Sequence, residues 1–393
     1  MFLPGRHPLE DAHGRRITVI MTRPTAGSTS RPGHAILNAT ASACVFSSVT
    51  GVCETIARGL VTPGSVPSRG SMHRAYLEFS GPPGTTLPWS LLRIVDEGGG
   101  DTGFGAVRSP VGAGDREALE QFAGERRLIG LTAYGTFPRI HAVFDGKERA
   151  IEGRDGRERP EVARCAAWAH CFRNPRQYLP PGRPQALISI SDFTDPGWVS
   201  AAGLGTPAAK RWDLIYVCCA NPFNELTKNW ALARRCLSRL ARDLGITALL
   251  VGRDQAPDIP DVPGIEACGE LPWHELMACL AQARVAFFPN VLDASPVLLT
   301  EALCLDVPVV VNRRILGGWK YVRPDTGRFF TDQDDVTGAV AACLTGDFAP
   351  RAWFSASHGP EHAASRLAAL LDAAAEHRLP AADDGAAAGQ AVP

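Results

Sequence analysis

A regular alternation of short apolar runs and helix-like segments begins at Trp212, and this alternation constrains the fold more than any other feature. Four runs are almost entirely apolar, as expected for strands buried on both faces of a sheet. They span residues 214–219, 246–251, 285–288 and 307–311. Between them, apolar residues recur at helical spacing in segments that begin near Lys228, Pro272 and Pro296. This order predicts a parallel, doubly wound α/β sheet.

The loops after the predicted strands are the places where a ligand is expected. Doubly wound sheets bind their ligands beyond the carboxyl ends of the strands. The loops in question begin after Cys219, Val251, Pro289 and Val311. Charged or polar residues in these loops are therefore the first candidates for a functional site.

The domain organisation follows from the length and from one linker-like stretch. A chain of 393 residues fits two domains, and the sequence AAGLGTPAAK at 201–210 marks a boundary between them. We expect an N-terminal domain at 1–205, a C-terminal domain at 212–345, a helical segment at 346–377 and a disordered tail at 378–393. Plausible strands of the N-terminal domain are 17–21, 91–95, 128–132, 141–144 and 186–190. Residues 24–88 are rich in Gly, Pro and Ser and are expected to be loop-rich or partly disordered.

Charge and cysteine usage exclude several classes of protein. Lys and Arg total 40 against 41 Asp and Glu, so no net field draws the chain to nucleic acid or to an anionic membrane. The eleven cysteines never form a Cys-x-x-Cys pair, which argues against a disulfide framework or a zinc site and favours a reducing compartment. The sequence has neither a signal-peptide pattern nor a transmembrane segment. A cytoplasmic protein is expected.

The sharpest candidate site is NVLDASPVLLTEAL, residues 290–303. Ser295 is a preferred N-cap and Pro296 a preferred first helical residue, so the free amides of this helix start are expected to face the loop, where they can bind phosphate. Asp293 lies just before the helix, and Glu301 lies about two turns inside it. On its own, the segment fits an ordinary capped helix with Glu301 on the surface better than it fits a site.

In a wider context, the chain resembles the group 1 glycosyltransferases (glycosyltransferase family 4, GT-B fold). FFPNVLDASPVLLTEALCLDVPVVVN gives Asp293, seven residues, Glu301 and then VPVVV, similar to the family's Glu, seven residues, Glu signature. The resemblance continues into GGWKYVRPDTGRFF. It also reaches back through Gly252-Arg253 and ACGELPWHELMACLAQARVAFFP, so that it covers about 212–345. Several ordered motifs at proper spacing are more specific than any one of them.

The resemblance implies two Rossmann-like domains that face a cleft, and a retaining, metal-independent transfer of sugar from a nucleotide-diphosphate sugar. The acceptor is a glycan, a lipid or a small molecule, and no cofactor is implied. Glu301 would bind the ribose hydroxyls, Asp293 the donor sugar, and Lys228 the leaving diphosphate. Further residues would supply backbone contacts: Ser295, Pro296, Val297 and Leu298 to the diphosphate, and Gly269, Glu270 and Leu271 to the base.

The sequence departs from the family pattern at two points of this site. Asp293 replaces a Glu and is one methylene shorter. The arginine that usually precedes the lysine is missing from NPFNELT, and Arg253 is a candidate substitute. Fixed cations and amide dipoles would stabilise the charge that builds on the leaving oxygens. The proposal therefore requires Lys228, Arg253 and Glu301 to line one common pocket.

In the N-terminal domain, polar residues cluster in two places. His170 and Arg173 lie in AAWAHCFRNP, and Ser191 and Asp192 lie in SISDFTD, after a predicted strand. His170 is either a residue of the acceptor cleft or a structural histidine, since a lone histidine fits both.

Two further patterns have simpler readings. Gly98, Gly100 and Gly103 spell the G-x-G-x-x-G pattern of dinucleotide-binding proteins, but the following residues are too rich in Gly and Pro for the required helix. A flexible loop is expected there. Asp332 and Asp334 match Asp-x-Asp, yet their polar surroundings favour a helix start over a metal site.

Two alternative functions stay open at this point. One is a sugar-nucleotide epimerase or phosphorylase-like enzyme of the same fold. The other is a catalytically inactive module that binds a nucleotide sugar, which the irregular first 120 or so residues suggest.

Overall fold

The fold is taken from a computed structural model that describes most of the chain from residue 74 onward. The described residues are 9–10, 16–17, 74–78, 87–88, 90–109, 111, 113–132, 141–144, 147–150, 160–201, 209–253 and 262–377. Residues 1–40 form a unit of their own, in which β1 (Leu9–Glu10) pairs antiparallel with β2 (Arg16–Ile17). Apart from Ile17, the strand expected at 17–21 lies outside the described residues.

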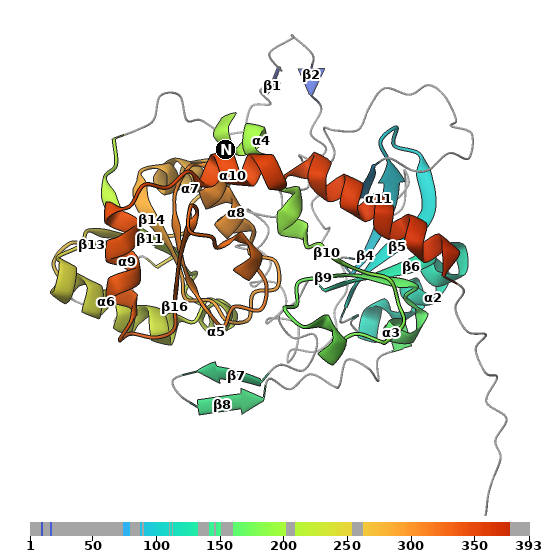
Figure 1. The fold of residues 1–393 in the computed structure, drawn as a ribbon, viewed down its shortest axis with the longest axis horizontal. Helices are drawn as coiled ribbons and strands as arrows, with labels where there is room; N and C mark the ends of the chain where they lie inside the picture. Colours follow the sequence, from blue (N-terminus) through green and yellow to red (C-terminus); the bar gives the residue numbers. More distant parts are fainter. Residues whose placement is uncertain are drawn as a thin grey trace, which may run out of the picture. The chain divides into compact units, whose positions relative to one another are not determined.

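The C-terminal sheet has six parallel strands (Figure 1). They are β11 (Trp212–Val217), β12 (Ala248–Val251), β13 (Ile265–Cys268), β14 (Ala283–Phe288), β15 (Val309–Asn312) and β16 (Gly327–Phe330). Their spatial order is β13-β12-β11-β14-β15-β16, which is the 3-2-1-4-5-6 order of dinucleotide-binding folds. The prediction of a doubly wound parallel sheet is confirmed. The strand order reverses between β11 and β14, and such a switch point is where these sheets bind ligands.

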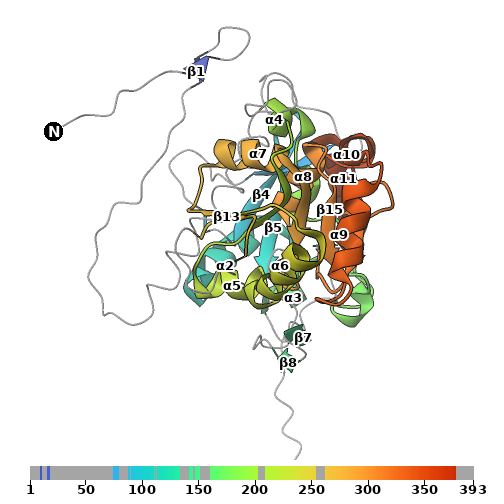
Figure 2. The same cartoon turned by 90° about the vertical axis from the view of Figure 1, so that its left-hand side faces the viewer.

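Helices cover both faces of this sheet because alternate strand residues point to opposite sides (Figures 1 and 2). One face carries α6 (Trp230–Leu244) and α9 (Val336–Thr345), and the other carries α7 (Trp273–Ala281) and α8 (Val297–Cys304). The remaining helices of this region are α5 (Pro222–Thr227) and α10 (Pro350–Ser357). Gly245 ends α6 with a left-handed φ of 61°, as the sequence predicts.

The N-terminal sheet also has six strands, but only three of its five strand pairs are parallel. Its strands are β3 (Ala75–Glu78), β4 (Leu91–Asp96), β5 (Asp101–Ser109), β6 (Arg127–Thr132), β9 (Ala167–His170) and β10 (Gln185–Leu187). From β5 to β10 the pairs are parallel, whereas β3, β4 and β5 pair antiparallel. The other elements of this region are α2 (Arg116–Glu125), α3 (Pro160–Arg164), α4 (Pro196–Ala201) and the hairpin of β7 (His141–Phe144) and β8 (Lys147–Ala150). The α/β class is therefore confirmed, with a sheet in each half of the chain.

The N-terminal half differs from the sequence predictions in local detail. Strand β3 lies inside the segment 24–88 that is expected to be loop-rich or partly disordered, and most of that segment lies outside the described residues. The glycine-rich stretch after β4 is a hairpin turn followed by the nine-residue strand β5, so the expected flexible loop ends at Gly100. A strand stands where a dinucleotide fingerprint needs a helix, and the exclusion of that motif is confirmed. The strand expected at 186–190 ends at Leu187, and the 3₁₀ helix η4 (Ile190–Phe193) follows it.

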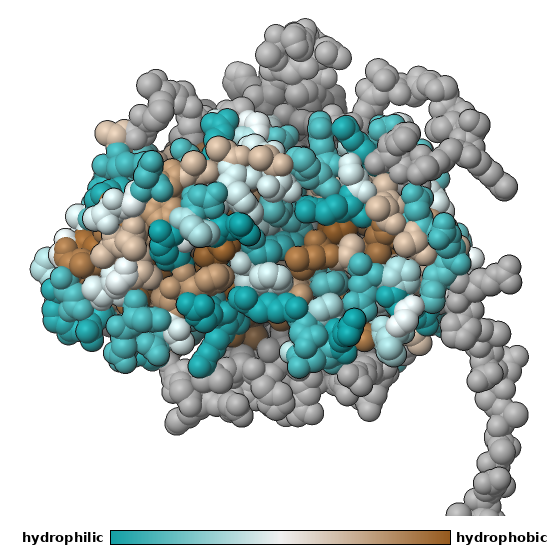
Figure 3. All heavy atoms as spheres, viewed as in Figure 1, coloured by the Kyte–Doolittle hydropathy of each residue, from teal (hydrophilic) through white to brown (hydrophobic). Residues whose placement is uncertain are grey.

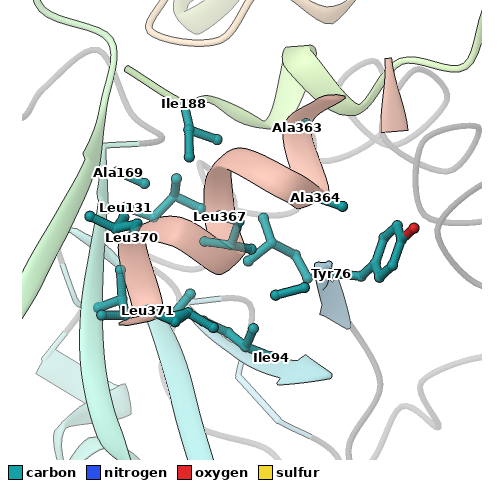
Figure 4. Close-up of a cluster of buried hydrophobic side chains, with 14 of the residues drawn as sticks. Tyr76, Ile94, Leu131, Ala169, Ile188, Ala363, Ala364, Leu367, Leu370 and Leu371 are labelled. Atoms are coloured by element: carbon teal, nitrogen blue, oxygen red, sulfur yellow. The ribbon is translucent and has the colours of Figure 1, made fainter. Parts of the chain in front are cut away.

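The last helix, α11 (Pro360–Glu376), packs on the N-terminal sheet although it follows the C-terminal sheet in the chain (Figure 1). Leu367, Leu370 and Leu371 of α11 join Ile94 and Leu131 of the sheet in one buried cluster (Figure 4). Burial of such side chains stabilises a fold by about 1.5–3 kcal/mol each. The C-terminal helix α11 thus completes the hydrophobic core of the N-terminal sheet.

The surface and the cysteines add three observations. Among the described residues, only Leu226 and Leu244 are large exposed hydrophobic residues, and Figure 3 shows a mostly hydrophilic face with small apolar patches. No described helix is long and apolar enough to cross a membrane. Eight described cysteines are free, in line with the argument against a disulfide framework, whereas Cys219 is disulfide-bonded.

Candidate functional site

An ion pair between Lys228 and Asp293 lies at the switch point of the C-terminal sheet. Lys228 follows α5 in the loop region after β11, and Asp293 lies in the loop after β14. The Lys228 Nζ is 2.9 Å from the Asp293 Oδ2, and the two side chains are 28% and 14% exposed. Asn290 donates a second hydrogen bond to the same oxygen at 3.0 Å. A cation and an anchored carboxylate thus meet where the strand order reverses.

The backbone around Lys228 is fixed to the neighbouring strand. Asn229 adopts a left-handed conformation with φ of 57°, which Asn and Gly tolerate best. Its Nδ2 donates to the carbonyl of Pro289 at 3.1 Å, at the carboxyl end of β14. The hydroxyl of Tyr216 donates to the carbonyl of Lys228 at 3.0 Å. These bonds position Lys228 beside the loop that carries Asp293.

The start of α8 differs from the prediction. Pro296 occupies the N-cap position and Val297 begins the helix, so the prediction of Ser295 as the N-cap is wrong. Ser295 instead contacts the N-terminal half of the chain. Its Oγ accepts a hydrogen bond of 2.8 Å from the amide of Ser191. Its own amide donates to Asp293 Oδ1 at 3.3 Å. The first amides of α8, those of Val297 and Leu298, have no carbonyl within the helix to bind, as at every helix start.

Arg253 lies near Lys228 but has different partners. Its side chain is 2% exposed, makes an ion pair with Glu225 and places its guanidinium 4.0 Å from the ring centroid of Trp230. Burial raises the pKa of Cys218, whereas the charges of both Arg253 and Lys228 act to lower it. Both cations therefore lie close to the carboxyl end of β11.

Glu301 is buried in an apolar environment within α8. It is 1% exposed, and its Oε1 accepts a hydrogen bond of 2.7 Å from the Trp273 indole. Its Oε2 has no partner among the residues that the structure describes. Burial raises the pKa of Glu301 to about 7, against the opposing effect of the Trp273 hydrogen bond. The structure thus brings Lys228 and Asp293 together, whereas among the described residues Glu301 binds Trp273 and Arg253 pairs with Glu225.

His170 ends β9 and is almost fully buried, at 6% exposed. Its Nδ1 accepts from the amide of Phe172 at 3.2 Å. Burial and the charge of Lys320 lower the pKa of His170 to about 4, so the imidazole is neutral at pH 7. The Trp319 indole donates to the carbonyl of Cys171 at 2.8 Å, which brings the loop after β15 against the end of β9.

The residues expected near the base lie between β13 and α7, at the carboxyl edge of the C-terminal sheet. The amide of Gly252 donates to the Gly269 carbonyl at 3.2 Å. Glu270 is exposed, and Leu271 packs against the core formed by α7 and α8. Their position relative to the sheet agrees with a ligand-binding loop, since they follow a strand end.

A buried network that was not foreseen links η4 to the 3₁₀ helix η5 (Trp319–Tyr321). Asp192 is fully buried and makes an ion pair with Lys320 and a 3.0 Å hydrogen bond with the hydroxyl of Tyr321. His358 and Arg366 each place a nitrogen 3.6 Å from its Oδ1. Asp192 therefore serves to hold segments together. The hydrogen-bond partners of Lys320 are more than 120 residues away in the chain, so no local pattern predicts the contact. The GGWKY motif is the one sequence signal that points to Lys320.

No group of three or more His, Cys, Asp or Glu side chains that could hold a metal ion occurs in the described part of the chain. The Asp332 carboxylate accepts a 2.9 Å hydrogen bond from the amide of Asp334, just before α9. These two residues belong to the turn that opens the helix.

Comparison with known proteins gives matches of structure alone. No protein-family model and no curated protein matches the chain. Three similar solved structures are TarM (13% identity, TM-score 0.45), the GtfA/B complex (10%, 0.46) and AviGT4, a glycosyltransferase involved in avilamycin A biosynthesis (17%, 0.42). The matches cover 64%, 67% and 68% of this chain and 50%, 56% and 80% of those chains. The chain spans half the length of TarM. The three TM-scores are below 0.5, so the function is inferred from the residues of the site.

Proposed function

We propose that the chain is a glycosyltransferase that binds a nucleotide-diphosphate sugar at the carboxyl edge of the C-terminal sheet. The observation that carries the proposal is the Lys228–Asp293 pair, 2.9 Å apart, at the switch point of a sheet with dinucleotide-binding strand order. The start of α8 follows Asp293 directly and adds amide dipoles that favour an anion. The acceptor is a glycan, a lipid or a small molecule.

In this proposal Lys228 and the first amides of α8 hold the diphosphate. Negative charge builds on the leaving oxygens as the sugar–phosphate bond breaks, so a fixed ammonium stabilises the transition state more than the ground state. Asp293 takes a hydroxyl of the donor sugar, and Asn290 keeps its carboxylate in place. Because Lys228 is 28% exposed, an incoming phosphate can reach its ammonium. Transfer with retention and without a metal ion is part of the proposal.

Glu301 is the proposed partner of the ribose hydroxyls. Its Oε2 is a buried acceptor without a donor among the described residues, and an unsatisfied buried oxygen costs about 1–3 kcal/mol. A ribose hydroxyl would satisfy it. The backbone of Gly269, Glu270 and Leu271 is the proposed contact of the base, since it lies at the end of the adjoining strand β13. His170 belongs to the acceptor side as a neutral imidazole.

Nucleotide binding to the Lys228→Met variant tests the proposal. Calorimetry with uridine, guanosine and adenosine diphosphates should give binding of one of them to the wild-type chain. Loss of one charge-assisted hydrogen bond should weaken that binding about tenfold or more. The matched control is Arg234→Met, which removes an exposed cation from α6 and should leave the affinity unchanged. Failure of all three nucleotides to bind would refute the proposal.

Product analysis separates the proposal from its rivals. Release of nucleoside diphosphate that depends on an added acceptor supports transfer, and the anomeric configuration of the product by NMR tests retention. Activity that persists in a chelator supports metal independence. Conversion of the donor without an acceptor would favour an epimerase, and binding without turnover would favour an inactive module. The cytoplasm is the proposed compartment, because the described cysteines other than Cys219 are free thiols.

A further inference from the structure

We propose that Arg173 and Arg313 bind a phosphate group carried by the acceptor. This inference rests on the proposed function, because it assigns a chemical class to the second substrate of the same site. Arg173 lies three residues beyond the end of β9, and Arg313 follows the last residue of β15. Both positions are at carboxyl ends of parallel strands, one in each sheet.

The two guanidinium groups gather around the same aromatic side chain. The Arg173 Cζ is 5.7 Å and the Arg313 Cζ is 5.3 Å from the ring centroid of Phe329. Arg173 also lies 4.8 Å from the ring centroid of Trp319 and donates to the carbonyl of Arg313 at 3.1 Å. Aromatic faces hold the two cations in place but do not neutralise their charge.

Neither arginine has an acidic partner within the described residues. Other arginines of the chain do: Arg126 pairs with Asp101, and Arg284 pairs with Asp213. Burial and the charge of Arg313 both lower the pKa of Arg173, so the two positive charges repel each other. A bound dianion would turn this repulsion into attraction. A phosphate monoester supplies two negative charges and oxygens that fit guanidinium forks.

The arginine pair lies beside the proposed donor site. The loop that begins at Arg313 runs to Leu316 and Gly317, whose amides donate to the carbonyls of Val291 and Asp293 at 2.9 and 2.8 Å. Arg173 comes from the same strand end as His170. A phosphate held by the pair would therefore place the rest of an acceptor between the N-terminal sheet and the loop of Asp293.

Binding of inorganic phosphate tests the pair without any need for turnover. Calorimetry at constant ionic strength should show phosphate binding to the wild-type chain with saturating nucleoside diphosphate, and the Lys228→Met variant should retain the phosphate site. Arg173→Met and Arg313→Met should each weaken it about tenfold or more, since each removes charged hydrogen bonds. Methionine preserves an apolar contact with the aromatic rings. Arg176→Met, which removes an exposed cation three residues from Arg173, is the matched control.

Pairs of acceptors test whether the phosphate group that the arginines bind belongs to the acceptor. A panel of sugars and their phosphate monoesters should show nucleoside-diphosphate release that prefers the phosphorylated member of a pair, and Arg173→Met should abolish this preference. Equal use of both members, or phosphate affinity that is the same in Arg173→Met, Arg313→Met and wild type, would overturn the inference. A different result would count against the proposed function: the wild-type chain binds phosphate, both arginine variants lose this binding, and no sugar supports transfer. The anion site would then exist without glycosyltransferase activity.

Discussion

The ammonium of Lys228 lies 2.9 Å from the carboxylate of Asp293, although 65 residues separate them in the chain. The sheet explains the contact, because β11 and β14 are adjacent strands and their following loops emerge at the same edge. Both side chains keep part of their surface exposed, so a ligand phosphate can reach the lysine and compete with Asp293 for it. Asp293 can then turn to a sugar hydroxyl while Asn290 still donates to it.

Replacement of Asp293 by Asn should therefore affect turnover more than nucleotide binding. The amide keeps the shape of the side chain but removes the charge that would interact with the developing oxocarbenium ion. Loss of an electrostatic contact of this type lowers turnover by about 10²–10³-fold. The affinity for nucleoside diphosphate should stay equal or rise, since Lys228 is released. Steady-state kinetics together with calorimetry check the two parts, and Asp347→Asn is an exposed control.

The Glu301→Gln variant should change how stability depends on pH. Burial raises the pKa of Glu301 from an ordinary 4.5 to about 7, so between these pH values the folded protein keeps a proton that the unfolded chain loses. The free energy of unfolding should therefore fall as pH rises from about 4.5 to 7 and stay constant above, by about 3 kcal/mol in total. Glutamine removes this dependence and still accepts from Trp273.

Urea denaturation of wild type and Glu301→Gln at pH 5 and pH 8 measures the effect. The difference between the two pH values should be smaller in the variant, and Glu97→Gln in an exposed turn should behave as wild type. An unchanged difference in Glu301→Gln would show that another group carries the pH dependence.

The sequence predicts the C-terminal sheet well because its strands are buried on both faces. Such strands are continuous apolar runs, and helices with clear periodicity separate them. In the N-terminal sheet the same reasoning fails at β5, which contains two glycines. A Cβ at Gly105 would lie 2.2 Å from the ring of Phe122, and one at Gly130 in β6 would lie 2.4 Å from Trp168. These glycines make room for aromatic rings from distant segments, which a local pattern does not show.

The candidate site is predictable to the same extent. The order of elements places the loops of Lys228 and Asp293 at one edge of the sheet, and the family resemblance singles out these two residues within the loops. The orientation of Glu301 towards Trp273 and the turn of Ser295 towards Ser191 depend on contacts with other elements. Both required a three-dimensional arrangement that no spacing in the sequence encodes.

Loss of Asp192 should destabilise the fold strongly. Asp192→Ala leaves the ammonium of Lys320, only 7% exposed, without its carboxylate, and removal of one member of a buried ion pair costs about 3–5 kcal/mol. The double variant Asp192→Ala/Lys320→Met should be less destabilised than the sum of the two single changes, because no buried ammonium is left without its carboxylate. Urea denaturation of the four proteins gives the coupling energy. Additive effects would mean that other groups neutralise Lys320.

Two substitutions at Asn229 should separate its backbone role from its hydrogen bond. Asn229 has φ of 57° and donates to the carbonyl of Pro289 at 3.1 Å. Glycine tolerates this conformation, so Asn229→Gly should lose only the hydrogen bond, about 1 kcal/mol. Alanine brings a Cβ into the left-handed region, so Asn229→Ala should lose about 1–2 kcal/mol more.

The same two variants test whether the backbone at Asn229 positions Lys228. If it does, nucleoside-diphosphate affinity should fall further in Asn229→Ala than in Asn229→Gly, in the same order as the free energy of unfolding. Calorimetry and urea denaturation give the two series. A lower stability of Asn229→Ala with an affinity equal to that of Asn229→Gly would show that Lys228 reaches its ligand independently of this turn, because a four-carbon side chain can then make up for the displaced backbone.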